Sequence, residues 1–174
     1  MAAPKGLKTT SSPIQISAKV TESVVNVFTT EEIPLTLNVL DNEVFVITQL
    51  NLDVDAPDMA GAGITKVVNA SISTTSRTSV GSIADSNVIG SAERIILTGA
   101  APAEPCASFD REDPLFSAIS EDYLAIVATN NMFLNIVGTL NGNAKSCRVR
   151  VYGYRASASS SVYAALVQSE LLSA

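Results

Sequence analysis

Apolar and polar residues alternate most regularly over residues 43–55, and this alternation predicts a β-strand with two different faces. The side chains of one face are mainly apolar, namely Val44, Val46, Leu50, Leu52 and Val54, with Thr48. Those of the other face are polar, namely Glu43, Gln49, Asn51, Asp53 and Asp55. Phe45 and Ile47 make this second face partly apolar. We therefore expect the first face to be buried, and another element or another subunit to cover the second face at Phe45 and Ile47.

Residues 132–155 predict two more strands, because the runs MFLNIVGTL and CRVRVYGYR are rich in Val, Ile, Phe and Tyr. Asn141 and Gly142 lie between them and tolerate positive φ, which predicts a hairpin. In the second run Val149 and Val151 fall on one face. The other face carries Arg148, Arg150, Tyr152 and Tyr154, which we take as candidates for contact with a polar ligand.

Shorter runs of the same kind occur at residues 14–28, 35–39, 66–75, 93–98 and 123–128, with loops rich in Pro, Gly and Ser between them. Together these runs amount to about eight strands, and no alternation of strands with helices is visible. The chain is therefore predicted to be all-β, an antiparallel β-sandwich of the Greek-key or jelly-roll kind.

The 174 residues are enough for one domain with a sizeable core. We expect a flexible N-terminal arm over residues 1–13, a sandwich over 14–156 and a C-terminal tail over 157–174. The arm orders against a neighbouring subunit or a polyanion, or it stays a disordered terminus. The tail is a short helix or an extra strand, and docks on the body or on a neighbour. The candidate interface residues of these segments are Lys5, Lys8, Tyr163, Leu166 and Leu171.

Composition adds a hint of association between copies. Hydrophobic residues make up 47% of the chain and charged residues 16%, whereas about a quarter of a typical soluble domain is charged. Either subunit contacts cover the surface, or the protein is a compact monomer rich in Ser, Thr and Ala. The net charge of −6 argues against a dedicated nucleic-acid binder.

The sequence offers little catalytic chemistry. It contains no histidine, which removes triads of the Ser-His-Asp type and most catalytic zinc sites. No phosphate-binding loop or dinucleotide fingerprint occurs, so we expect neither an enzyme nor a cofactor. The one metal candidate is a calcium site at Asp53, Asp55 and Asp58, for which the alternative is a solvated polar face. Cys106 and Cys147 form a disulfide or, in the interpretation we favour, remain free thiols.

Targeting signals are equally sparse. The first 13 residues lack the apolar core of a secretory signal, and no run of about 18 apolar residues predicts a transmembrane segment. We therefore expect synthesis in the cytoplasm.

Charged residues are segregated along the chain. Residues 20–65 contain no Lys or Arg but many carboxylates, whereas residues 145–155 contain Lys145, Arg148, Arg150 and Arg155 and no acid. The two regions pair across adjacent strands of one subunit or across a subunit interface, and we favour the first. The basic strand with its tyrosines is also a candidate contact for a glycan or a nucleic acid.

The order of elements is a small polar arm, the long strand NEVFVITQLNLDVD, a Ser/Thr-rich middle and the pair FLNIVGTLNGN and CRVRVYGYRA. This order resembles that of the single jelly-roll structural proteins of icosahedral virions, in particular small phage or archaeal-virus coat and accessory proteins. The resemblance spans most of the chain and assigns no site residues. It implies a capsid subunit, or a subunit of a related particle or tail, that resides in the virion and assembles with copies of itself and with other virion proteins. The alternative is a β-sandwich module that binds glycans or a receptor.

Overall fold

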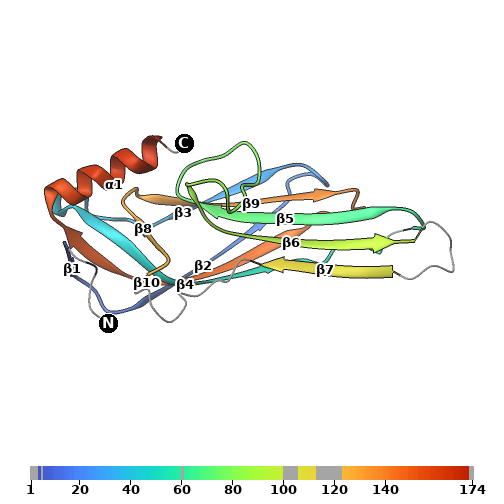
Figure 1. Ribbon diagram of the computed structural model, residues 1–174, viewed down its shortest axis with the longest axis horizontal. Helices are drawn as coiled ribbons and strands as arrows, with labels where there is room; N and C mark the ends of the chain where they lie inside the picture. Colours follow the sequence, from blue (N-terminus) through green and yellow to red (C-terminus); the bar gives the residue numbers. More distant parts are fainter. Residues whose placement is uncertain (1–3, 5, 60, 100–105, 113–122, 173–174) are drawn as a thin grey trace.

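The computed structural model describes residues 4, 6–59, 61–99, 106–112 and 123–172, apart from the side chains of residues 112 and 171. The strands form two antiparallel layers along one long axis (Figure 1). The first sheet contains β1 (Leu7–Thr9), β2 (Ile14–Thr21), β4 (Glu43–Val54), β8 (Ala125–Val127) and β10 (Ser146–Ala158). The second sheet contains β3 (Thr29–Pro34), β5 (Thr65–Ser73), β6 (Val88–Thr98), β7 (Cys106–Glu112) and β9 (Asn131–Thr139). One α-helix, α1 (Ser160–Leu172), and a 3-10 turn, η1 (Val39–Asp41), complete the described elements.

The strand order is that of a jelly roll. In the first sheet it is β2–β10–β4–β8, with β1 also pairing with β10, and in the second it is β3–β9–β5–β6–β7. The first long strand therefore pairs with the last, β3 with β9, β4 with β8 and β5 with β6. A long antiparallel ribbon folded over on itself gives this nested pairing, which defines the jelly roll. The prediction of an all-β sandwich is confirmed, and β7 adds an edge strand to the second sheet.

The core lies between the sheets, where the inward side chains of both layers meet. Its largest fully buried members include Phe45, Ile47, Leu50, Ile72 and Leu134. Fully burying an aliphatic or aromatic side chain of this size stabilises the fold by about 1.5–3 kcal/mol. The apolar alternation that predicted the strands is thus what holds the two layers together.

A β-bulge in β4 changes which residues face the core. Gln49 pairs with Tyr152 but Ile47 pairs with Gly153, so Thr48 is an extra residue. One extra residue reverses the alternation, and Phe45 and Ile47 point into the core while the residues between and before them point outward. The prediction that Val44 and Val46 share the core face of Leu50, Leu52 and Val54 is therefore wrong.

Helix α1 covers the outward apolar residues of the first sheet (Figure 1). Val44 and Val46 form a second cluster with Tyr154 and two alanines of β10, and Val162, Tyr163, Leu166 and Val167 of α1 pack on it. The expectation that another element covers the outer face of this strand is confirmed, with the helix on Val44 and Val46 rather than on Phe45 and Ile47.

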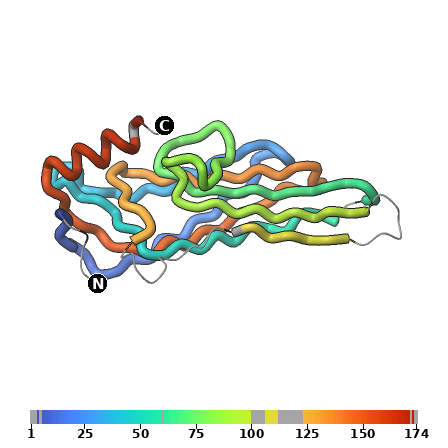
Figure 2. The backbone as a smooth tube through the Cα atoms, viewed as in Figure 1, coloured from blue at the N-terminus to red at the C-terminus, as the bar shows by residue number. Residues whose placement is uncertain are grey.

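Both terminal segments lie at the same end of the sandwich (Figure 2). Residues 7–9, inside the expected arm, form β1 and pair with residues 156–158 of β10. The tail takes the helical alternative. Within the described residues, no helix has the length and apolar character needed to span a membrane.

Strands β9 and β10 do not form the expected hairpin. They belong to different sheets, because β9 lies between β3 and β5 while β10 lies between β2 and β4. Residues 140–145 therefore cross from one sheet to the other. The positive φ in this loop is at Leu140, at 57°, and not at Asn141 or Gly142. Strand propensity predicted both strands correctly, but the turn residues predicted the wrong connection.

Candidate functional site

Ion pairs join the basic strand β10 to the acidic strand β4 within one chain. Arg148 Nη1 lies 3.0 Å from Asp55 Oδ1 and 3.3 Å from Asp53 Oδ2. At the other end of these strands Arg155 Nη1 lies 3.4 Å from Glu43 Oε2. The favoured prediction, pairing across adjacent strands of one subunit, is confirmed. Because the Arg148 pairs are on the surface, solvent screens them and they contribute little to stability.

The residues expected to meet a polar ligand do not form one exposed surface. Arg148 and Arg150 are exposed and Tyr152 is half-buried, but Tyr154 is buried beneath α1. The prediction of two exposed tyrosines is wrong for Tyr154, because the helix covers that end of the face. What remains open is a shallow depression lined by Ser17, Lys19, Asn51, Asp53, Arg148 and Arg150.

The three calcium candidates all accept hydrogen bonds from protein donors. Asp53 and Asp55 pair with Arg148, and Asp55 Oδ2 also accepts the backbone N–H of Ser146 at 2.9 Å. Asp58 binds Lys145 and two backbone N–H groups. Among the residues that the structure describes, no three carboxylates or thiols converge as metal ligands.

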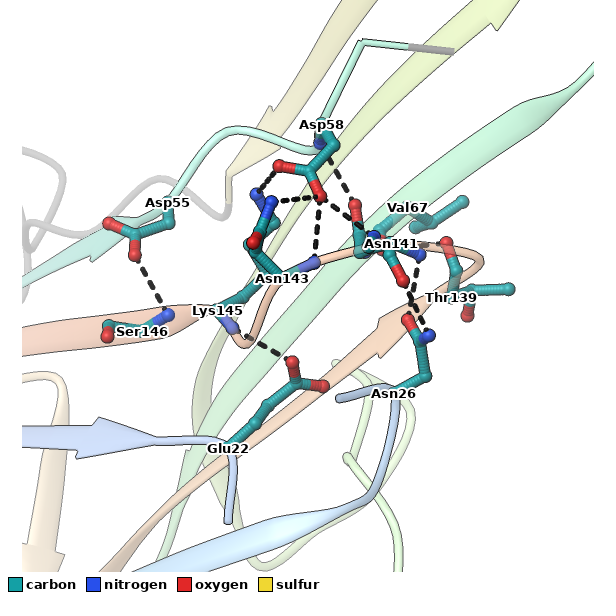
Figure 3. Close-up of polar contacts among 11 residues, drawn as sticks. Glu22, Asn26, Asp55, Asp58, Val67, Thr139, Asn141, Asn143, Lys145 and Ser146 are labelled. Atoms are coloured by element: carbon teal, nitrogen blue, oxygen red, sulfur yellow. Dashed lines mark hydrogen bonds and ion pairs between the residues drawn. The ribbon is translucent and has the colours of Figure 1, made fainter. Parts of the chain in front are cut away.

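A buried carboxylate connects the two sheets at the end of the sandwich where β2 finishes (Figure 3). Glu22 Oε1 accepts the backbone N–H of Gly138 at 2.6 Å, and Oε2 accepts that of Lys145 at 2.9 Å. The N–H of Glu22 donates in turn to the carbonyl oxygen of Lys145 at 2.9 Å. This single side chain links the end of β2 to β9 and to the start of β10.

Two asparagines extend this connection to three loops. Asn26 Nδ2 donates to the carbonyl oxygen of Asn141, and the N–H of Asn141 donates to Asn26 Oδ1, both at 2.9 Å. The buried side chain of Asn141 also accepts the N–H of Asp58 at 3.0 Å and donates to the carbonyl oxygen of Val67 at 2.9 Å. Loops 22–28, 55–59 and 140–145 are therefore interlocked.

The ion pair between Lys145 and Asp58 completes the arrangement, with Nζ and Oδ1 2.6 Å apart. Asp58 Oδ2 accepts the N–H groups of Gly142 at 2.8 Å and Asn143 at 3.0 Å. The bond from Lys145, aided by these N–H groups, holds the pKa of Asp58 well below its usual range. We call Glu22, Asn26, Asp58, Asn141 and Lys145 the loop network.

The sequence pattern does not predict this network as a unit. It indicates Asp58 only as a calcium ligand, Lys145 only as part of the basic strand and Asn141 only as a turn residue. Polar residues in loops normally face solvent, and nothing in the local pattern around Glu22 or Asn26 signals burial. The network depends on contacts between residues more than 80 positions apart, such as Asp58 with Asn141.

The candidate interface residues of the termini have different positions. Lys8 is exposed on β1, whereas Lys5 lies outside the described residues. Tyr163 and Leu166 pack on the body of their own chain. Leu171 belongs to α1, but its side chain is not among those described.

Glu170 fastens the end of α1 to the sandwich. Its Oε1 accepts the N–H of Ala128 at 2.8 Å and its Oε2 that of Thr129 at 3.1 Å. Burial raises the pKa of this carboxyl group, although the two N–H groups act in the opposite direction. Glu170 is the one residue of the helix sequence that is an acid or a base of the Asp, Glu, Lys, Arg or His type, and it points inward. The exposed positions of α1 are uncharged, namely Ser160, Ser161, Ala164, Ala165, Gln168, Ser169 and Leu172.

In the native protein the free energy of unfolding is expected to fall as pH rises past the pKa of Glu170. Replacing Glu170 by glutamine is expected to remove this fall. Because the folded-state pKa of Glu170 is raised, the folded chain binds this proton more tightly than the unfolded chain. The free energy of unfolding therefore falls as pH rises from the ordinary glutamate pKa through the raised value. Urea titrations across this range measure the free energy of unfolding of the native protein and of Glu170→Gln. The native value minus the Glu170→Gln value should fall as pH rises, and a difference that grows with pH would contradict the prediction. The lowered pKa of Asp58 changes stability only below the ordinary aspartate pKa. Both proteins share this effect, so it cancels in the difference.

The two cysteines are free thiols, as favoured from the sequence. Cys106 is exposed on β7, and Cys147 is buried in β10 of the other sheet. Burial, followed by the nearby charges of Asp53 and Asp55, raises the pKa of Cys147 to about 12. A thiol protonated at neutral pH is a poor nucleophile, so Cys147 packs as a small apolar side chain.

No protein-family model and no curated protein matches the chain. Among solved structures it is similar to one of Desmodium yellow mottle tymovirus, at 12% identity and a TM-score of 0.30, over 91% of this chain and 94% of the other. It is also similar to the tailspike protein gp49 of Acinetobacter baumannii bacteriophage Fri1, a capsular polysaccharide depolymerase, at 14% identity and a TM-score of 0.16, over 79% of this chain and 20% of the other. Such TM-scores establish no fold, and the jelly-roll assignment depends on the strand pairing alone.

Proposed function

We propose that the chain is a virion structural protein, a subunit that self-assembles into a capsid shell or a related particle or tail component. The observation that carries this proposal is the nested pairing of β2 with β10, β3 with β9, β4 with β8 and β5 with β6. Viral capsid subunits use this architecture, as do lectin domains. The subunit would be made in the host cytoplasm and would reside in the virion with copies of itself and other virion proteins.

Surface character favours assembly over the lectin-like alternative. Interface cores are depleted of charge, and the outer positions of α1 carry none. The candidate glycan contact on β10 included two tyrosines, but Tyr154 is buried and Tyr152 half-buried, so neither ring is fully open to stack on a sugar. The lack of histidine and the protonated, buried Cys147 support a non-catalytic role.

The terminal segments belong to this proposal with a modified role. Because β1 and α1 cover parts of their own chain, we assign contact with neighbouring subunits to the outer face of α1 and to the arm that carries Lys5 and Lys8. Deleting either segment would also uncover the body, so a loss of assembly after truncation would not identify an interface. Point substitutions on exposed residues are the sharper test.

The purified chain is expected to form closed particles or a fixed oligomer. Its mass should be followed by light scattering over a concentration series at low and high salt, with negative-stain microscopy of the same samples. A contact built from uncharged surfaces should persist at high salt, where ion pairs are screened. A monomer at every concentration would overturn the proposal, and glycan binding by that monomer would support the alternative.

A further inference from the structure

Leu140 has an unfavourable conformation for its residue type. Its φ of 57° is in the left-handed region, where the Cβ of a residue other than Gly or Asn is strained against the following carbonyl oxygen. Its side chain is 63% exposed, so burial within the chain does not offset that strain. The facing loop also contains a residue in this region, Asn26 at φ 60°, but asparagine tolerates the left-handed conformation. Leucine at position 140 therefore has little to contribute inside its own chain.

Three more apolar side chains are exposed on the interlocked loops. Val24 is 62%, Val27 45% and Met59 83% exposed. The backbone at Leu140 lies close to these residues, because Asn141 bonds both Asn26 and Asp58. We call Val24, Val27, Met59 and Leu140 the loop-end patch. A group of exposed apolar residues of this kind is typical of an interaction site.

The charged residues of the three interlocked loops are all buried or paired, and Asp55 pairs with Arg148. Glu22 and Lys145 are buried, and Asp58 is paired with Lys145. The whole chain carries a net charge of −6, so contacts between its charged surfaces bring like charges together. At an apolar loop end whose charges are buried or paired, two copies approach without that repulsion. The same network fixes the loops before contact, which lowers the entropy cost of association.

We propose that the loop-end patch is a contact through which copies of this chain associate. The inference depends on the proposed self-assembly and specifies where it occurs. The partner that binds the patch is a second copy of the chain. Two copies have the same net charge, and the patch lets them meet without bringing like charges together. Leu140 is the residue expected to contribute most, since its conformation is explained by a contact outside the chain.

The test compares Leu140→Asn with Leu40→Asn. Asparagine tolerates the left-handed region, so the Leu140→Asn monomer should unfold at the same temperature as the native chain or higher. Association should nevertheless weaken about 10- to 100-fold, as expected for loss of one buried leucine. Leu40 is 93% exposed in η1, at the other end of β4, so Leu40→Asn should assemble like the native chain. Light scattering and thermal unfolding of the three proteins give both readouts.

The outcomes separate this inference from the proposed function. If the native chain assembles and Leu140→Asn assembles equally well, the loop-end contact is wrong while the structural role stands. If the native chain is monomeric throughout, both fail. Flotation with neutral phosphatidylcholine vesicles tests the other occupant. If Leu140→Asn loses vesicle binding but keeps its association, the patch is a lipid contact and the inference is overturned.

Discussion

Replacing Gly153 by alanine is expected to lower the midpoint of thermal unfolding by about 10 °C or to prevent folding. A Cβ at this position would overlap the carbonyl oxygen of Val46 and lie 2.9 Å from ring carbons of Phe45. The nearest atom is backbone, so no side-chain rotation relieves the clash. Overpacking typically costs about 1–3 kcal/mol, and a clash with backbone belongs at the upper end of that range. Each kcal/mol lowers the midpoint by about 2–4 °C in a chain of this size. Circular dichroism during heating measures the effect.

Gly142→Ala is the matched control. A Cβ at Gly142 would be 3.6 Å from Asp58 Oδ2, an ordinary contact, and the backbone there has no positive φ. Its unfolding midpoint should stay within about 2 °C of the native value. Position 153 is where β10 faces the extra residue of β4. If Gly153→Ala unfolded like Gly142→Ala, the close approach of β4 to β10 at the bulge would be wrong.

The bulge also explains the limit of the strand predictions. The alternation over residues 43–55 predicted β4 correctly, since a period of two requires only local sequence. The side on which each residue lies also depends on the partner strand, and the shift at Thr48 appears only in the pairing with Tyr152 and Gly153. Hence the buried set Leu50, Leu52 and Val54 was predicted, whereas the faces of the residues before the bulge were reversed.

The prediction of the topology failed for the same reason, because local sequence does not decide which strands pair. Asn141 and Gly142 are good turn residues, but the pairing of β9 and β10 is decided by which strands fill the positions beside them. Asn141 also has a buried side-chain amide whose partners, Asp58 and Val67, lie in two other segments, which a turn assignment does not anticipate. Long-range contacts of this kind are specified by the assembled sheets rather than by the sequence around the loop.

Charge gave a clearer signal than turn chemistry. Carboxylates without nearby cations in one segment and cations without acids in another predicted that the two segments pair, and the structure shows the pairs of Arg148 with Asp53 and Asp55. The same reasoning did not find Glu22, because its carboxylate binds backbone N–H groups and not a cation. Every residue except proline carries a backbone N–H, so composition cannot identify which of these groups a buried carboxylate will bind.

Replacing Glu22 by alanine is expected to lower the free energy of unfolding by about 3 kcal/mol or more. The N–H groups of Gly138 and Lys145 would lose their acceptor, at about 1–3 kcal/mol for each buried donor left unpaired. Urea unfolding measures the total. Amide hydrogen exchange at these two residues should report the local loss.

Glu32→Ala is the control, because Glu32 is exposed on β3; its stability should change by less than about 0.5 kcal/mol. Equal stability of the two variants would mean that Glu22 does not connect the sheets.

Glu22→Ala should also weaken association, because it loosens the loops that carry the loop-end patch. Leu140→Asn should weaken association without this loss of stability. A network that only stabilised the monomer would give reduced stability in Glu22→Ala but unchanged association in Leu140→Asn.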